Sequence, residues 1–396
     1  MKKNIILGIV LCVIISGCKQ NKKNTVNTDY ITIAIDPPKA LNEVNMSDIF
    51  SKVDYIPLET NDECLIGRIE QILVYKDRLY LLDRFQTKSV FCYSKDGKFL
   101  YQIDKKGQGP GEYIDIDNIS IDHDNDRLLL YFNHNVLEYD LNGNYVKTHH
   151  FDIWAHQFTY IGNNCAAFYG GYTTNREYEK ENMTPNLFIT ENYKKVIHTD
   201  LYFRSTRNIS ALIGLFSNFS NDYSGTVSFL SSYNDTVYHL TPNAVKRAYY
   251  IDFGKMKKSK SYYTLLSSPT ATIEAVNDNN DYCNIRTMTE TRTCLFIEYW
   301  HRRIFHWVFY YKDTGKIIDV CHDYSNDESG AFPMWDDIHN ICCVVPIWTD
   351  GHSFYGYIDA YIIAEKKESV TDPEVKKKIE NLSEYDNPVI VVMTPK

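Results

Sequence analysis

Basic and aromatic residues at the tips of apolar segments are the groups in this chain best suited to bind a ligand. Trp300, His301 and Arg302 occupy one such tip, between two apolar runs. Arginine pairs bidentately with carboxylates and tryptophan offers a flat stacking surface, so this combination suits an anionic or sugar-like ligand. Each residue could equally be a solvated loop group without a ligand. Three more arginines are expected in loops of the same kind: Arg84, Arg204 and Arg207.

Motifs for catalysis, metal binding or cofactor binding are weak by comparison. The run Asp122-His123-Asp124-Asn125-Asp126 has the alternating acids of a calcium loop, but it lacks the sixth-position Gly and has Asn133 at the twelfth position. A hairpin turn explains it better. The glycines of Gly107 to Tyr113 suggest a phosphate loop, but no helix follows and Pro110 removes a donor. We therefore assign no catalytic residue, no metal and no cofactor from the sequence.

The elements that position these residues are best defined between Ile66 and Tyr113, which reads as four short strands. Two of its turns are Lys76-Asp77 and Asp96-Gly97, and an Asp-Gly pair between alternating apolar runs is a strong hairpin signal. The last hairpin turn of each unit recurs at intervals of 46, 50, 50 and 72 residues, at Gly97, Gly143, Tyr193, Asn243 and Gly315. Four strands with a period near 50 residues are typical of propeller blades.

A sixth unit is incomplete in sequence order. Its first two strands are predicted at Phe332 to His339 and Ile341 to Trp348, and its third at Pro388 to Met393. The fourth would be Val53 to Leu58, from the N-terminal end, which closes the ring and leaves no free sheet edge. The sequence therefore predicts an all-β fold, a six-bladed β-propeller of four-stranded blades over residues 31–396.

Three insertions interrupt the period, at Gly171 to Thr184, Gly254 to Asp281 and Thr349 to Asn387. Connections between strands two and three, and from strand four to the next blade, emerge on the same face of a propeller, so all three insertions are predicted on one face. Long loops on a rigid scaffold commonly carry binding residues, although loops also lengthen neutrally at little cost. We expect any ligand to bind to this inserted face.

The N-terminal segment predicts export. Lys2 and Lys3 precede the apolar run Ile5 to Ile15, which is too short to span a bilayer. Ile15-Ser16-Gly17-Cys18 resembles a bacterial lipobox, so we expect residues 1–17 to be a lipoprotein signal peptide, Cys18 to carry lipid, and 18–30 to be a polar tether. An ordinary signal peptide with an incidental cysteine is the alternative.

Charge and cysteine content narrow the function classes. Without residues 1–17 the chain has 40 basic and 51 acidic residues, a net charge of −11, which argues against a nucleic-acid partner. Eight cysteines remain after Cys18, and none forms the C-x-x-C spacing of a zinc or redox site. We interpret most of them as small buried hydrophobic residues, with room for one disulfide.

The repeat unit resembles an NHL-type β-propeller repeat, and the chain is similar to six-bladed propeller lipoproteins of Bacteroides-like bacteria. The segments that carry the resemblance are Tyr55 to Thr60, Lys95 to Phe99, Gly107 to Tyr113 and Asn387 to Val391. The resemblance implies an outer-membrane lipoprotein whose propeller is a binding or scaffold domain for a glycan, a peptide or a protein partner. The alternative is a lyase or hydrolase with its active site in the central channel.

The side of the outer membrane is a separate expectation. Residues Lys19 to Lys23 follow the lipidated cysteine and lack an acidic cluster. This composition favours the periplasmic face over the cell surface.

Overall fold

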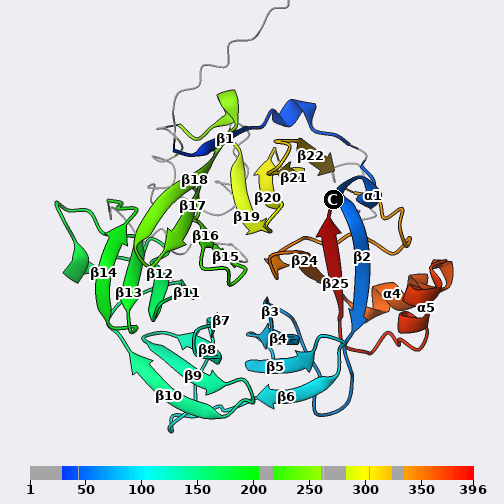
Figure 1. Ribbon diagram of the computed structural model, residues 1–396, viewed down its shortest axis with the longest axis horizontal. Coiled ribbons are helices and arrows are strands. Elements are labelled where there is room, and N and C mark those ends of the chain that lie inside the picture. Colours follow the sequence, from blue (N-terminus) through cyan, green and yellow to red (C-terminus); the bar gives the residue numbers. More distant parts are fainter. Residues whose placement is uncertain are drawn as a thin grey trace, which may run out of the picture.

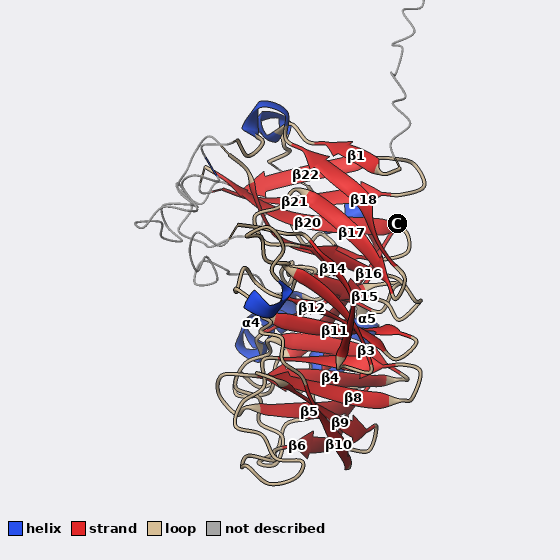
Figure 2. Cartoon of the chain, turned by 90° about the vertical axis from the view of Figure 1, so that its left-hand side faces the viewer, coloured by secondary structure: helices blue, strands red, loops and turns tan. Residues whose placement is uncertain are grey.

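The computed structural model describes residues 29–42, 44–204, 217–259, 262, 282–302, 304–322 and 334–396. Within them the strands form six sheets arranged around a central axis (Figure 1). Figure 2 shows the ring from the side, with the strands of successive sheets stacked along it. The six-bladed all-β prediction is therefore confirmed.

The first three blades are continuous in sequence, and each runs from its inner to its outer strand. The first contains β3 (Gln71–Tyr75), β4 (Arg78–Asp83), β5 (Ser89–Ser94) and β6 (Phe99–Ile103). The second contains β7 (Asn118–Asp122), β8 (Arg127–Phe132), β9 (Asn135–Asp140) and β10 (Tyr145–His150). The third contains β11 (Gln157–Gly162), β12 (Cys165–Tyr169), β13 (Leu187–Glu191) and β14 (Lys195–Asp200).

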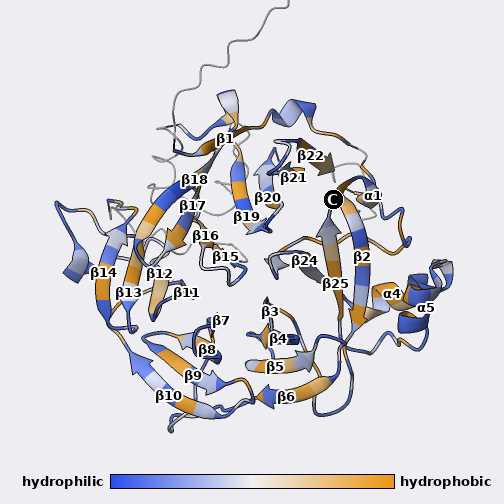
Figure 3. Cartoon of the chain, in the orientation of Figure 1, coloured by the Kyte–Doolittle hydropathy of each residue, from blue (hydrophilic) through white to orange (hydrophobic). Residues whose placement is uncertain are grey.

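The next two blades complete the continuous part of the ring. The fourth contains β15 (Phe219–Asn221), β16 (Val227–Leu230), β17 (Thr236–Thr241) and β18 (Ala244–Asp252), and β1 (Ile31–Ala34) adds to it in parallel with β18. The fifth contains β19 (Asn284–Glu290), β20 (Cys294–His301), β21 (Ile304–Tyr311) and β22 (Ile317–His322). Hydrophobic residues lie within every blade, whereas β10 is largely hydrophilic (Figure 3).

The sixth blade joins the two ends of the ring. It consists of β23 (Trp348–Thr349), β24 (Phe354–Ile358), β25 (Val389–Pro395) and the N-terminal β2 (Phe50–Pro57), in that order. Strand β2 pairs antiparallel with β25, with Val53 opposite Met393 and Tyr55 opposite Val391. The predicted closure of the ring by an N-terminal strand is thus confirmed.

The predicted inner strands of this blade, Phe332 to His339 and Ile341 to Trp348, are wrong. Residues 334–347 form no strand, and β23 and β24 begin later. The Asp336 carboxylate accepts backbone N–H groups of Ile338, His339 and Ile341, which folds the segment into turns. Met334, Ile341, Cys343 and Val344 are buried without a β-ladder, so the hydrophobicity of the segment imitates a strand.

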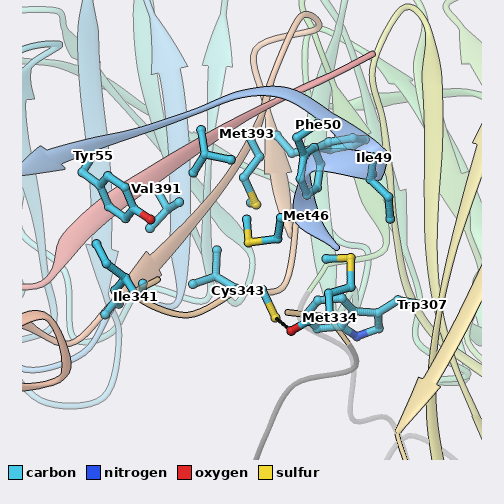
Figure 4. Close-up of a cluster of buried hydrophobic side chains, with 14 of the residues drawn as sticks. Met46, Ile49, Phe50, Tyr55, Trp307, Met334, Ile341, Cys343, Val391 and Met393 are labelled. Carbon is cyan, nitrogen blue, oxygen red and sulfur yellow. Dashed lines mark hydrogen bonds between the residues drawn. The ribbon is translucent and has the colours of Figure 1, made fainter. Parts of the chain in front are cut away.

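This segment packs against the first helix. Met46 and Ile49 of α1 (Met46–Ile49) are buried with Met334 and Cys343 near the interface of the fifth and sixth blades (Figure 4). The remaining described helices are short: η1 (Pro37–Lys39), η2 (Arg176–Tyr178), η4 (Gly254–Met256), α4 (Ala360–Lys366), η6 (Lys367–Ser369) and α5 (Pro373–Ile379).

The two faces of the ring differ as predicted. Connections on one face include 170–186 between β12 and β13, 253–283 between β18 and β19, and 359–388 between β24 and β25. The third insertion starts later than predicted, because residues 349–358 belong to β23, a turn and β24. Turns on the opposite face have two to five residues. We call these the long-loop face and the short-turn face.

Side-chain amides connect the inner strands of neighbouring blades. Gln71, the first residue of β3, donates to the carbonyl of Ile119 at 2.8 Å and accepts its N–H at 2.8 Å. Asn118, the first residue of β7, makes the same pair of contacts with Phe158 of β11, at 2.8 and 3.2 Å. Gln157, the first residue of β11, accepts the N–H of Asn218 at 2.9 Å. These bonds replace a ladder between inner strands that are too divergent to pair.

Of the cysteines, the eight after Cys18 are free in the structure, and six are buried. The interpretation as mainly buried hydrophobic residues is confirmed. Residues 1–28, which include the predicted signal peptide and Cys18, lie outside the described part of the chain.

We expect Asn118→Leu to destabilise the propeller, because it leaves both the N–H and the carbonyl of Phe158 buried without a partner. Each such group costs about 1–3 kcal/mol. Ser120→Ala is the matched comparison, since Ser120 accepts only one backbone bond, from Tyr160 at 3.0 Å. Urea denaturation should rank Asn118→Leu as clearly less stable than Ser120→Ala. Equal stabilities would contradict the role of the amide connections.

Candidate functional site

A cavity of about 330 Å³ lies in the central channel, and residues from all six blades line it. Small-molecule pockets usually measure about 300–1,000 Å³. The cavity is lined by charged, amide and aromatic side chains together. It is the natural candidate site, because it combines concavity with convergent polar groups.

The mouth of the cavity on the long-loop face is built from one repeated position. Glu70, Asp117 and His156 each precede the inner strand of their blade and line the cavity. Their backbone N–H groups donate to the second strand in the same way, at 2.8, 2.7 and 2.7 Å. The repeat therefore places one side chain per blade at an equivalent point around the opening.

Arg84 connects two of these residues. It follows β4 on the long-loop face, and its Nη2 lies 2.5 Å from Asp117 Oδ1. Its backbone N–H donates to Glu70 Oε2 at 2.6 Å. The other oxygen of Glu70 lies 3.2 Å from Nε of Arg68, which also lines the cavity. The first two blades thus present two cations and two carboxylates in alternation.

Burial shifts the protonation equilibria at the mouth. It raises the pKa of the Glu70 and Asp117 carboxyls, and the charge of Arg84 opposes that rise in both. Burial, with a contribution from Arg84, lowers the pKa of His156 and favours its neutral form. The mouth therefore contains both hydrogen-bond acceptors, the carboxylates, and hydrogen-bond donors, the arginines.

A fifth-blade arginine completes the charged lining. Arg286 of β19 lines the cavity, and its guanidinium lies 4.8 Å from the ring centroid of Phe305 and 5.8 Å from that of Trp300. Its Nη1 is 3.6 Å from Oε1 of buried Glu298, whose pKa is raised by burial. Trp300 therefore positions a cation at the channel.

The structure separates the residues predicted to bind. Arg84 lines the cavity. Trp300 does not line it, but its ring contacts Arg286, which does. His301 is buried at the end of β20, and Arg302 is exposed at the tip that follows, with φ of 51°. Arg204 is exposed after β14 on the same face, outside the cavity lining. Arg207 lies outside the described residues.

Sequence reasoning missed Arg68, Glu70, Asp117, His156 and Arg286. Aligning the blades on the first residue of each inner strand would have found Glu70, Asp117 and His156, because all three occupy the preceding position. Arg286 falls where the register between β19 and β20 shifts, between Ile285 and Thr287. Such a bulge turns an additional side chain toward the channel and leaves no signal in the sequence.

The two doubtful motifs are turns. The Asp122 carboxylate accepts the N–H groups of Asp124 and Asn125 at 3.0 Å each, as in a hairpin turn. In the Gly107 to Tyr113 segment, the N–H of Gly107 donates to the carbonyl of Tyr113 at 3.0 Å between two blades. Within the described ranges, no three His, Cys, Asp or Glu side chains are grouped as a metal site.

A second polar cluster lies toward the short-turn face, between the fourth and fifth blades. The buried Glu290 carboxylate accepts from Ser228, His239, Tyr249 and Lys312. Burial disfavours its ionised form, but His239 and Lys312 prevail and lower the pKa of Glu290 to about 2. This cluster is saturated by its own members, so we assign it a structural role.

We expect Glu290→Gln to destabilise the protein, since Lys312 loses its carboxylate. Loss of one partner of a buried pair costs about 3–5 kcal/mol, and solvent access to Lys312 should keep the cost at or below that range. Because the folded-state pKa lies below the ordinary value, the stabilisation is present above about pH 4.5 and is lost as the pH falls toward 2.

Acid titration of the free energy of unfolding checks this expectation. Glu290→Gln should flatten the wild-type decline over that pH interval, whereas Glu191→Gln, at the exposed end of β13, should leave it unchanged. An unaltered decline in Glu290→Gln would show that other carboxyls are responsible.

The fold and the lined channel define the protein as a six-bladed β-propeller with a polar site at one mouth of its channel. Residues 31–394 match the model of the domain of unknown function DUF4934, so the chain belongs to that family. A search of curated proteins finds no match.

Solved structures support the fold assignment. A Bacteroides fragilis protein named "putative exported protein" is 16% identical, with a TM-score of 0.72 over 92% of this chain and 99% of that one. A member of the DUF4221 family from Bacteroides vulgatus is 11% identical, with a TM-score of 0.49 over 88% and 97% of the two chains. A virginiamycin B lyase from Staphylococcus aureus is 12% identical, with a TM-score of 0.36 over 68% and 73%. The first likeness supports the fold alone, and the other two are too weak to inform activity.

Proposed function

We propose that this protein is a lipid-anchored binding protein of the bacterial cell envelope. Its propeller recognises a glycan, a peptide or a protein partner at the channel mouth on the long-loop face. The observation that carries the proposal is the cavity itself, with charged groups of neighbouring blades converging at one opening. A rigid scaffold that fixes such groups is suited to binding.

Binding, rather than catalysis, is supported by how the polar groups are used. Arg84, Asp117 and Glu70 are engaged with one another, which fixes their positions. Pre-organised groups of this kind lose little conformational freedom when a ligand arrives. Arg204 and Arg302 lie on the same face, where they would contact the parts of a larger ligand that extend beyond the cavity.

Location follows from the N-terminal sequence. The lipobox-like segment supports lipid attachment at Cys18 to the outer membrane, and the absence of an acidic cluster in Lys19 to Lys23 favours its periplasmic side. Among the helices of the described residues, none is long and apolar enough to span a bilayer. In this proposal the lipid at Cys18 holds the propeller at the membrane.

We expect Cys18→Ala to release the protein from the membrane, because the acyl chains would have no attachment site. The measurement is fractionation of cells expressing the full chain, with metabolic labelling by a palmitate analogue. Cys12→Ala, within the signal segment, is the control and should remain lipidated. Continued membrane fractionation of unlabelled Cys18→Ala would contradict the anchor.

We expect Arg84→Ala to weaken ligand binding by more than about 1 kcal/mol, since it removes a cavity-lining anchor. Ligands are first found by a thermal-shift screen of glycans and peptides against residues 19–396, and the affinities are then measured by calorimetry. Trp300→Ala should also weaken binding, because it removes one ring beside Arg286.

Arg127→Ala is the matched control, since Arg127 begins β8 on the short-turn face. If the affinity for a ligand is unchanged by Arg84→Ala and Trp300→Ala but lost with Arg127→Ala, the ligand binds to the short-turn face and the proposal is wrong. Melting temperatures of the free variants separate a loss of binding from a loss of folding.

A further inference from the structure

We infer that the channel mouth binds the end of a neutral carbohydrate rather than an anion. This inference rests on the proposed binding function and specifies its ligand class. It follows from three properties of the lining: paired charges, a carboxylate with spare acceptor capacity, and an exposed aromatic ring.

The charges are matched within the site. Arg84 faces Asp117, the Arg68 Nε lies 3.2 Å from Glu70, and Arg286 lies 3.6 Å from Glu298. An incoming anion would compete with a carboxylate for each arginine, and the displaced carboxylate would remain partly buried at a cost. Each of these three arginines has a carboxylate partner, so the charged pairs together carry no net positive charge. A neutral ligand meets no such competition.

One carboxylate at the mouth retains capacity for a hydroxyl donor. Glu70 Oε1 is buried beside Arg68 without a hydrogen bond, so a ligand does not reach it. Asp117 Oδ2 has only a long contact, 3.4 Å from the N–H of Asn133. A carboxylate oxygen offers two lone pairs, so Asp117 can accept from one ligand hydroxyl while an arginine donates to its neighbour. Vicinal hydroxyls, which donate and accept side by side, match this alternation.

The nearby amides are used differently. The side-chain carbonyl and NH₂ groups of Gln71 and Asn118 form hydrogen bonds with the backbone of the neighbouring blade. They therefore shape the wall of the cavity, while the charged pairs supply its recognition groups. The pairs Arg84–Asp117 and Arg68–Glu70 lie at the mouth, where the end of a ligand would enter.

An aromatic ring completes the site. Phe85 lines the cavity with 63% of its surface exposed, and the Arg84 guanidinium lies 5.1 Å from its ring centroid. An exposed phenylalanine beside ion-paired polar groups suits a ligand with one apolar face and a polar edge, which describes a sugar ring. Trp154, 54% exposed, lies two residues before His156 and has the His134 ring 4.2 Å away. It offers a second surface for a longer chain.

The volume restricts what enters. At about 330 Å³ the cavity is near the lower end of ligand pockets, so a terminal sugar fits better than an internal stretch of polymer. The rest of an oligosaccharide would leave over the long-loop face.

The test is direct binding of methyl glucoside, methyl galactoside, methyl mannoside and N-acetylglucosamine, compared with glucuronate and galacturonate. Saturation-transfer NMR and calorimetry on residues 19–396 provide the readouts. We expect at least one neutral sugar to bind with an affinity that is independent of salt, and its acidic counterpart to bind no more tightly. Failure of every neutral sugar to bind would overturn the inference.

Substitutions locate the contact. Phe85→Ala should weaken sugar binding at least about fivefold. Asp117→Asn should weaken it and shift preference toward the uronates, because it frees Arg84 from its counter-ion. Tyr385→Ala removes an aromatic ring that is 82% exposed and outside the cavity lining, and should have no effect.

The outcomes distinguish the two proposals. Tighter binding of uronates, weakened by salt and by Arg84→Ala but not by Phe85→Ala, would overturn the carbohydrate inference and leave the proposed binding function standing. If a ligand binds with an affinity that none of the four substitutions changes (Arg84→Ala, Trp300→Ala, Phe85→Ala and Asp117→Asn), the channel mouth is not the binding site.

Discussion

The arrangement depends on hydrogen bonds between side-chain amides and the backbones of neighbouring inner strands. Inner strands of a propeller are sheet edges, and their N–H and carbonyl groups need partners. Gln71 and Asn118 supply both partners to the next blade. Because each is the first residue of its strand, the preceding residue, Glu70 or Asp117, is fixed at the channel mouth. The amide connections therefore hold the charged groups of the candidate site in register.

The architecture was predictable where local signals agreed with the repeat. Turn pairs such as Lys76-Asp77, with φ of 47° and 57°, and Asn192-Tyr193, with 51° and 61°, occur at the expected period. The closing strand was recognisable because it was apolar and unassigned. The inner strands of the sixth blade were predicted wrongly because residues such as Ile341 are buried but do not pair with another strand. Hydrophobicity alone does not distinguish a buried irregular segment from a β-strand.

The candidate site was predictable only in part. Arg84 could be placed by strand connectivity, but Glu70 and Asp117 look like ordinary solvated charges unless the blades are compared position by position. Arg286 depends on a register shift that only the three-dimensional pairing reveals. The pairing of charges at the mouth was not predictable for the same reason, since Arg84 is recognisable in a loop whereas its partner Asp117 comes from the next blade.

The closure of the ring by β2 and β25 has a consequence for how the chain folds. The two strands pair residues as far apart as Val53 and Met393, so the last blade cannot form until nearly the whole chain has been synthesised. Contacts of such long range close slowly, because the loop entropy is lost before they form. Until then β24 lacks its neighbour and presents an open edge. A chain truncated near its C-terminus should therefore be a substrate for proteases and chaperones rather than a smaller propeller.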